Sequence, residues 1–130
     1  MQNNWRTIGQ QQFSALTRRV EGVPVVQVFG EVDLSTAPRL RRTISEAVAA
    51  GGTGESPRAL LLDLSRTDFF DSSGLGLLVE QQRELRKLGT ELELVVGGEQ
   101  IPRILQNTGL DLKFTLHPDL DTAMDEHRNS

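Results

Sequence analysis

The chain has 130 residues, 37% of them hydrophobic and 25% charged, which is the length and composition of one globular domain rather than of a disordered chain. Its formal net charge of −4 argues against nucleic acid or an anionic lipid surface as the main binding partner. Because it holds no cysteine, disulfide bonds, thiol nucleophiles and Cys-based metal sites are excluded.

The first elements along the chain predict a β-hairpin. Residues 1–12 are polar and rich in Gln and Asn, and we expect a loose arm with Trp5 packed back onto the domain. Residues 13–20 place apolar side chains among polar ones, and Gly22 makes a turn. Residues 23–29 are β-branched and nearly all apolar, which suits a buried strand. The two segments together predict an antiparallel pair.

A loop over residues 30–38 leads into the first predicted helix. Ser35 or Thr36 can cap this helix, and Pro38 is tolerated in its first turn. The glycine-rich stretch 51–57 ends the helix and predicts a flexible loop. The apolar side chains of the helix fall on one face, formed by Ala37, Leu40, Ile44, Ala47 and Val48.

The second half of the chain alternates strands and helices. Residues 59–64 are continuously apolar, which is typical of a central strand covered on both faces, and we expect Leu62 to be fully buried. Residues 65–68 predict a polar turn before a helix that runs to about Lys87, with a buried stripe of Leu75, Leu78, Val79, Gln82 and Leu85. The remaining segments predict a strand at 92–96, a helix between Gly98 and Gly109, a short strand at 112–116 and a helix at 118–127.

This order of elements predicts an α/β fold. Strand–helix–strand units give parallel strands with right-handed crossovers. We therefore expect a mixed β-sheet with an N-terminal hairpin, mostly parallel remaining strands and about four helices. No apolar run approaches the ~20 residues that span a bilayer, and residues 1–6 lack the apolar core of a signal peptide. We accordingly expect a soluble, cytoplasmic protein that does not bind membranes.

The segment Asp-Ser-Ser-Gly-Leu-Gly, residues 71–76, lies between an apolar pair and a helix start. It places the hydroxyls of Ser72 and Ser73 where backbone N–H groups are unpaired and the helix dipole is positive. A phosphate on Ser72 would be stabilised by that field and by those donors. The alternative is plain helix capping, which the motif taken alone favours, because Ser and Asp are common N-caps.

A second segment, Gly-Glu-Val-Asp-Leu-Ser-Thr-Ala at residues 30–37, also lies between a strand end and a helix start. If its strand neighbours the strand at 59–64, both loops open on the same edge of the sheet, where α/β folds place their sites. Taken singly, Asp33 in this segment is explained as a turn or capping residue.

Together the two segments resemble the STAS family, and more closely its bacterial anti-sigma factor antagonists. The resemblance rests on residues 30–37, on Leu-Asp-Leu at 62–64 and on Phe-Phe-Asp-Ser-Ser-Gly-Leu-Gly at 69–76. It extends from about Phe13 to Met124. It implies an arm at 1–12, a single STAS domain at 13–127 and a tail at 128–130.

The resemblance implies a phosphorylation switch at Ser72. In this family an anti-sigma factor that is also a serine kinase phosphorylates the first serine of the Asp-Ser-Ser block. The unphosphorylated antagonist binds that kinase and frees its sigma factor, and a PP2C-type serine phosphatase restores the active form. Asp33 matches the acidic residue of the family's first strand–helix loop, and Thr36 matches the threonine that starts the first helix.

The partner surface is expected to combine the two loops with the start of the second helix. Gly74 and Gly76 would leave room for a partner backbone, and Leu77 is expected off the buried stripe. The predicted contact residues are Asp33, Ser35, Thr36, Asp71, Ser72, Ser73, Gly74, Gly76 and Leu77.

Other functions find less support in the sequence. A Gly-x-Ser-x-Gly motif is absent, His117 precedes Pro118 where we expect a loop or surface position, and His127 is expected in solvent, so we predict no catalytic residue. The glycines at 51–54 follow a helix and lack a Gly-Lys-Ser/Thr sequence, so they predict a linker. The acidic residues near the C-terminus fit a solvated helix face, and no metal or cofactor is predicted; they are Asp119, Asp121, Asp125 and Glu126.

One alternative keeps the fold and changes the task. Some STAS domains are non-phosphorylated scaffolds, or adaptors of signalling or membrane-associated complexes. The two serines and the Asp33 loop favour the switch.

Overall fold

The chain begins its fold with the expected hairpin. The computed structural model describes residues 13–51 and 54–129, so the predicted arm with Trp5 and part of the 51–57 loop lie outside the described residues. Strand β1 (Ser14–Val20) pairs antiparallel with β2 (Val23–Val32) across a turn in which Gly22 has a φ of 84°. Strand β2 continues through Val32, three residues beyond the predicted strand.

The strands lie in the sheet in the order β1-β2-β3-β4-β5, which is their order in the chain. Parallel pairing joins β2 to β3 (Ala59–Phe70), β3 to β4 (Glu91–Val95) and β4 to β5 (Thr115–His117). The prediction of a mixed sheet with a hairpin and parallel remaining strands is therefore confirmed.

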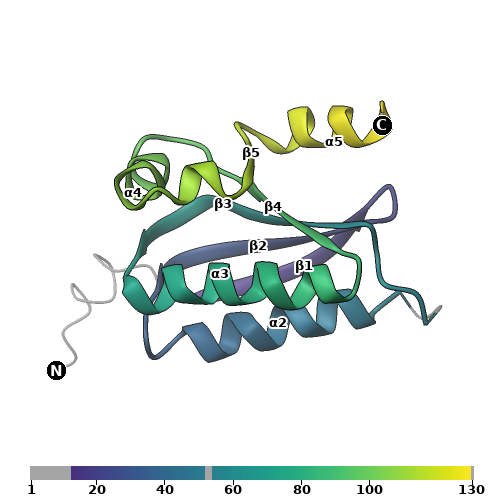
Figure 1. Ribbon diagram of the computed structural model, residues 1–130, viewed down its shortest axis with the longest axis horizontal. Helices are drawn as coiled ribbons and strands as arrows, with labels where there is room; N and C mark the ends of the chain where they lie inside the picture. Colours follow the sequence, from purple (N-terminus) through teal and green to yellow (C-terminus); the bar gives the residue numbers. More distant parts are fainter. Residues whose placement is uncertain (1–12, 52–53, 130) are drawn as a thin grey trace, which may run out of the picture.

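Helices cover both faces of this sheet. Helices α2 (Ala37–Ala49) and α3 (Ser72–Lys87) lie side by side on one face, and α5 (Leu120–Arg128) lies on the other (Figure 1). Helix α4 (Gln100–Thr108) and the short helix η1 (Leu110–Leu112) connect β4 to β5. In the described part of the chain, no helix combines the length and apolar character needed to cross a membrane.

The core forms because alternate residues of the central strands point to opposite faces. Leu60, Leu62 and Leu64 join the larger cluster, under α2 and α3, whereas Leu61 joins the smaller one, with Ala123 and Met124 of α5. Leu62 is 0% exposed, as expected for a strand that is buried on both faces.

Two local predictions were wrong. The predicted turn at 65–68 is part of β3, because register shifts between β2 and β3 let the strand absorb extra residues without ending. Leu112, expected in the last strand, ends η1 with 87% of its surface exposed, since the chain still makes a helical turn there.

Candidate functional site

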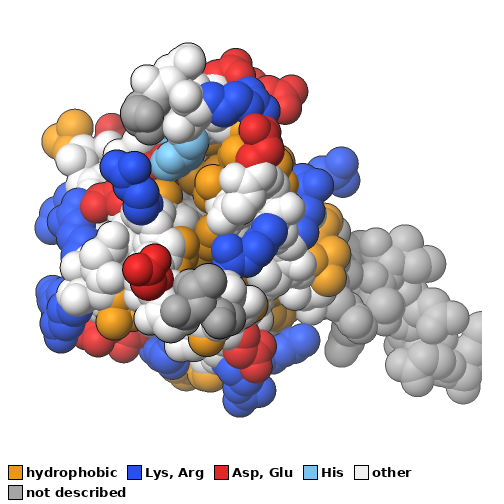
Figure 2. Space-filling view, turned by 90° about the vertical axis from the view of Figure 1, so that its right-hand side faces the viewer, with side chains coloured by type: hydrophobic (Ala, Val, Ile, Leu, Met, Phe, Trp, Pro, Cys, Tyr) orange, Lys and Arg blue, Asp and Glu red, His pale blue; other side chains and the backbone are white. Residues whose placement is uncertain are grey.

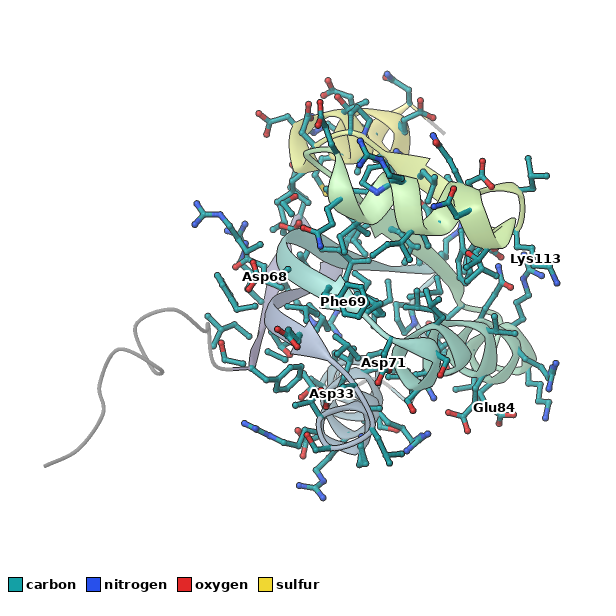
Figure 3. All side chains as sticks on the ribbon, turned by 90° about the vertical axis from the view of Figure 1, so that its left-hand side faces the viewer. Asp33, Asp68, Phe69, Asp71, Glu84 and Lys113 are labelled. Atoms are coloured by element: carbon teal, nitrogen blue, oxygen red, sulfur yellow. The ribbon has the colours of Figure 1, made fainter. Side chains whose placement is uncertain are left out.

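The two predicted motif loops meet at the carboxyl ends of β2 and β3. Val32 and Phe70 are register partners in the parallel ladder, so the loops that follow them start side by side. The backbone N–H of Asp71 donates to the carbonyl oxygen of Val32 at 3.1 Å and ties the second loop to the first. Figure 3 views this end of the molecule, with Asp33 and Asp71 labelled on the two loops.

The first loop is organised by the carboxylate of Asp33. One carboxylate oxygen, Oδ1, accepts hydrogen bonds from the backbone N–H groups of Ser35 (2.9 Å) and Thr36 (3.1 Å). The same atom accepts from the hydroxyls of Ser35 (2.8 Å) and Thr36 (3.2 Å). Thr36 is the N-cap residue of α2 by position, but its side chain makes no capping bond. Asp33 therefore holds the turn that starts α2.

These bonds stabilise the ionised form of Asp33. The Ser35 hydroxyl contributes most, followed by the backbone N–H groups of Thr36 and Ser35, and together they hold the pKa of Asp33 below its ordinary value despite partial burial. The carboxylate is consequently charged at neutral pH and fixed in position beside the second loop.

The second loop presents Ser72 at the start of α3. Asp71 is the N-cap residue, and its Oδ1 accepts from the backbone N–H of Gly74 at 3.0 Å. Ser72 is exposed, whereas Asp71 and Ser73 are half-buried. The first N–H groups of α3 have no partner within the helix, so a negatively charged group on Ser72 would lie in a favourable field. The geometry therefore suits Asp71 as the capping residue and Ser72 as a phosphate acceptor.

Gly74 does not leave space for a partner, contrary to the prediction. A Cβ atom built on Gly74 would lie 2.6 Å from the carbonyl oxygen of Val32 and 2.7 Å from Cδ2 of Phe70. The missing side chain instead lets α3 pack directly against the ends of the two strands. Gly76 differs, because it is exposed and a Cβ there would meet no atom within 4 Å.

Leu77 is also placed differently from the prediction. It is 2% exposed and belongs to the larger core cluster, so the expected surface position is wrong. The buried face of α3 differs from the predicted stripe because it includes Gly74 and Gln81, neither of which has an apolar side chain. Its buried residues are Gly74, Leu77, Leu78, Gln81, Gln82 and Leu85. Leu77 cannot contact a partner without disruption of the core.

Two exposed apolar residues at this end were not predicted. Leu34, in the first loop, is 77% exposed, and Phe69, near the end of β3, is 41% exposed. The Phe-Phe sequence beside the motif gives a sign of the exposed Phe69. Neighbouring residues of a strand point to opposite faces, so Phe69 and Phe70 cannot both point into the same core.

The opposite end of the molecule holds a cavity of about 430 Å³ between the β1–β2 turn, the start of β3 and α5. Figure 2 looks onto this end, where a pale blue histidine lies beside apolar atoms. His117 is 5% exposed, with Nε2 2.6 Å from Oε1 of Glu93, so the expected loop or surface position is wrong. His127 lies 3.1 Å from the same oxygen and is half-buried rather than free in solvent. Through Glu93 of β4, His117 holds β5 and His127 holds α5. Both histidines lie away from the motif loops.

Sequence comparison places these features among known proteins. Residues 14–123 match the STAS domain family. The anti-sigma-F factor antagonist RsfB of Mycobacterium tuberculosis is 34% identical over 103 residues, which cover 79% of this chain and 80% of the relative. The anti-sigma-B factor antagonist of Listeria monocytogenes is 31% identical over 83 residues, or 64% of this chain and 68% of that protein.

Structural comparison gives the same result. An anti-sigma factor antagonist from Mycobacterium paratuberculosis is similar, with a TM-score of 0.77 and 38% identity over 90% of this chain and 95% of that one. The family match over residues 14–123 includes both motif loops.

Proposed function

The chain belongs to the STAS domain family, and from this premise we propose that it is an anti-sigma factor antagonist, a regulator that acts by binding rather than by catalysis. The names of its relatives support this function. We propose further that its partner is an anti-sigma factor with serine kinase activity, and that binding makes this partner release its sigma factor. The single observation that carries the proposal is the exposed Ser72 at the start of α3, beside the ordered Asp33 loop.

Phosphorylation of Ser72 is the proposed off-switch. Oγ of Ser72 forms a bond to the γ-phosphorus of ATP while the bond from that phosphorus to the bridging oxygen breaks, so ADP leaves and the hydroxyl proton passes to a base. The Ser72 hydroxyl makes no hydrogen bond within residues 13–51 and 54–129. The base and the Mg²⁺-bound ATP are therefore assigned to the kinase, and a PP2C-type phosphatase reverses the reaction.

The phosphate acts on binding more than on folding. It adds about −1.5 to −2 charges at neutral pH. The unpaired N–H groups at the start of α3 stabilise this charge, whereas Asp71 and Asp33 repel it, so the fold is retained. In a fitted interface, however, an added charge without a partner is costly to desolvate. Phosphorylated protein should therefore release the anti-sigma factor.

The test uses each anti-sigma factor encoded in the source genome, purified and mixed with this protein and Mg²⁺-ATP. We expect one of them to bind and then to phosphorylate Ser72, as mapped by mass spectrometry. Ser72→Ala should bind without being phosphorylated, and Ser72→Asp should bind weakly. Ser73→Ala is the matched control and should still accept phosphate.

Each contrary outcome has a distinct meaning. Phosphate on Ser73, or on neither serine, would show that the switch residue is wrong. Stable binding without any phosphorylation would favour the scaffold or adaptor function instead. Binding to none of the anti-sigma factors would overturn the antagonist function itself.

A further inference from the structure

The end of β3 carries features that the proposed switch does not use. Phe69 is 41% exposed while the adjacent Phe70 is 2% exposed and packs in the larger core cluster. Leu34, from the neighbouring loop, is 77% exposed. Phe69, labelled in Figure 3, and Leu34 thus lie where β2 and β3 end, at the same end of the sheet as Ser72.

A β-bulge explains why this end of β3 projects outward. Gly30 pairs with Thr67, but the next residue of β2, Glu31, pairs with Phe69, so Asp68 is an extra residue without a partner in β2. Such bulges bend a strand and redirect its side chains. Asp68 and Phe69 are consequently both exposed, beside Glu31.

The charges around these apolar residues are mainly negative. The carboxylates of Glu31 and Asp68 are exposed and make no ion pair or side-chain hydrogen bond with the part of the chain that the structure describes. Asp33 and Asp71 add two more carboxylates on the adjoining loops. These four carboxylates lie on residues 31–34 and 66–71, and the basic residue on these two segments is Arg66. The carboxylates on the two segments are therefore in excess.

We propose that the anti-sigma factor binds over the end of β3 as well as at the start of α3, through a patch formed by Glu31, Leu34, Asp68 and Phe69. This inference rests on the proposed function. The patch fits a partner face with apolar recesses for Phe69 and Leu34, because buried aromatic anchors dominate interface energies. A rim of Lys and Arg on that face would complement Glu31 and Asp68, which steers association and selects the partner.

The apolar part is tested by affinity measurements with the anti-sigma factor that binds the wild-type protein. Phe69→Ala and Leu34→Ala should each weaken binding by about tenfold. Leu112→Ala is the matched control, since Leu112 is 87% exposed but lies on η1. Leu34 is exposed enough that its truncation leaves the fold intact, so this variant remains informative if Phe69→Ala unfolds. Unchanged affinity of Leu34→Ala and of folded Phe69→Ala would overturn the patch.

The charged part is tested by association kinetics at several salt concentrations. Asp68→Asn and Glu31→Gln should slow association at low salt and reduce its dependence on ionic strength. Glu126→Gln, which removes an exposed carboxylate from α5, should leave both unchanged. Rates equal to the wild type in both patch variants would contradict the proposed basic rim. If wild-type protein binds no anti-sigma factor, the proposed function fails; if it binds and the variants bind equally well, only this inference fails.

Discussion

Gly74 fixes the distance between α3 and the ends of the two central strands. Because a Cβ there would lie 2.6 Å from the backbone oxygen of Val32, Gly74→Ala must displace backbone rather than a flexible side chain. We expect a loss of about 1–3 kcal/mol in the free energy of unfolding, measured by urea denaturation. The same substitution at Gly76 should stabilise the protein by about 0.5–1 kcal/mol, since alanine fits open space in a helix.

The comparison of the two glycines separates helix propensity from close packing. Both residues lie in the first turns of α3, so propensity alone would make both substitutions stabilising. An equal effect at the two positions would contradict the close contact with Val32. Only the structure distinguishes them, because the sequence spacing gives no sign of which glycine faces the strands.

Among the elements, β3 contributes most to the interior. Leu62 is 0% exposed and lies between β2 and β4, so Leu62→Ala should lower the free energy of unfolding by about 2–5 kcal/mol in a denaturation experiment. Leu112→Ala, on the exposed η1, should change it by less than about 0.5 kcal/mol. A loss below that value for Leu62→Ala would be incompatible with a central position for this strand.

The sequence predicts elements better than it predicts their ends and faces. The apolar run at 59–64 predicts the centre of β3, but the rest of the strand was missed because polar residues at 65–68 are accommodated by register shifts, which depend on pairing with β2. The buried face of α3 was misjudged at Gly74, Leu77 and Gln81, which are buried although the predicted stripe left them out. Gln82 was predicted on that stripe and is buried, and its amide donates to the carbonyl oxygen of Lys113, a residue far away in the chain.

The candidate site was partly predictable for a physical reason. Parallel neighbouring strands bring their carboxyl ends together, so two motifs that each follow a strand could be expected at one edge. The roles of Asp33, Ser35 and Thr36 could not be predicted. Side-chain capping by Thr36 and turn formation by Asp33 are both compatible with this short segment, and the structure shows the second. The β-bulge that exposes Phe69 also depends on register, which sequence alone does not give.

For the molecule as a whole, ionised carboxylates link stability to pH. The pKa of Asp33 is lowered by the Ser35 hydroxyl, that of Asp119 by the Thr122 backbone N–H, and that of Glu21 by a hydrogen bond from Arg128. Lowered folded-state pKa values add stability that is present above the unfolded values of about 3.9 for Asp and 4.3 for Glu. This stability is lost as the pH falls through the lower folded-state values.

The free energy of unfolding should therefore depend less on pH in the acid range when one of these carboxylates is removed. We expect the unfolding free energy of the wild type to fall as the pH is lowered from about 5 to 2, and Asp33→Asn to fall less steeply over that range. Asp68→Asn is the control, because Asp68 is exposed and accepts no hydrogen bond from the described residues. Parallel pH profiles for wild type and Asp33→Asn would contradict the stabilisation of the Asp33 carboxylate by its loop.

The agreement between strand order in the sheet and strand order in the chain bears on how the protein emerges from the ribosome. Each newly synthesised strand finds its neighbour already made, so the sheet can grow at one edge during translation without waiting for distant segments. The loop of Asp33 follows the second strand made, but its fixed position against α3 requires residues up to Gly74 to leave the exit tunnel. Nascent chains stalled before that point should hold the hairpin without the paired loops of Asp33 and Asp71.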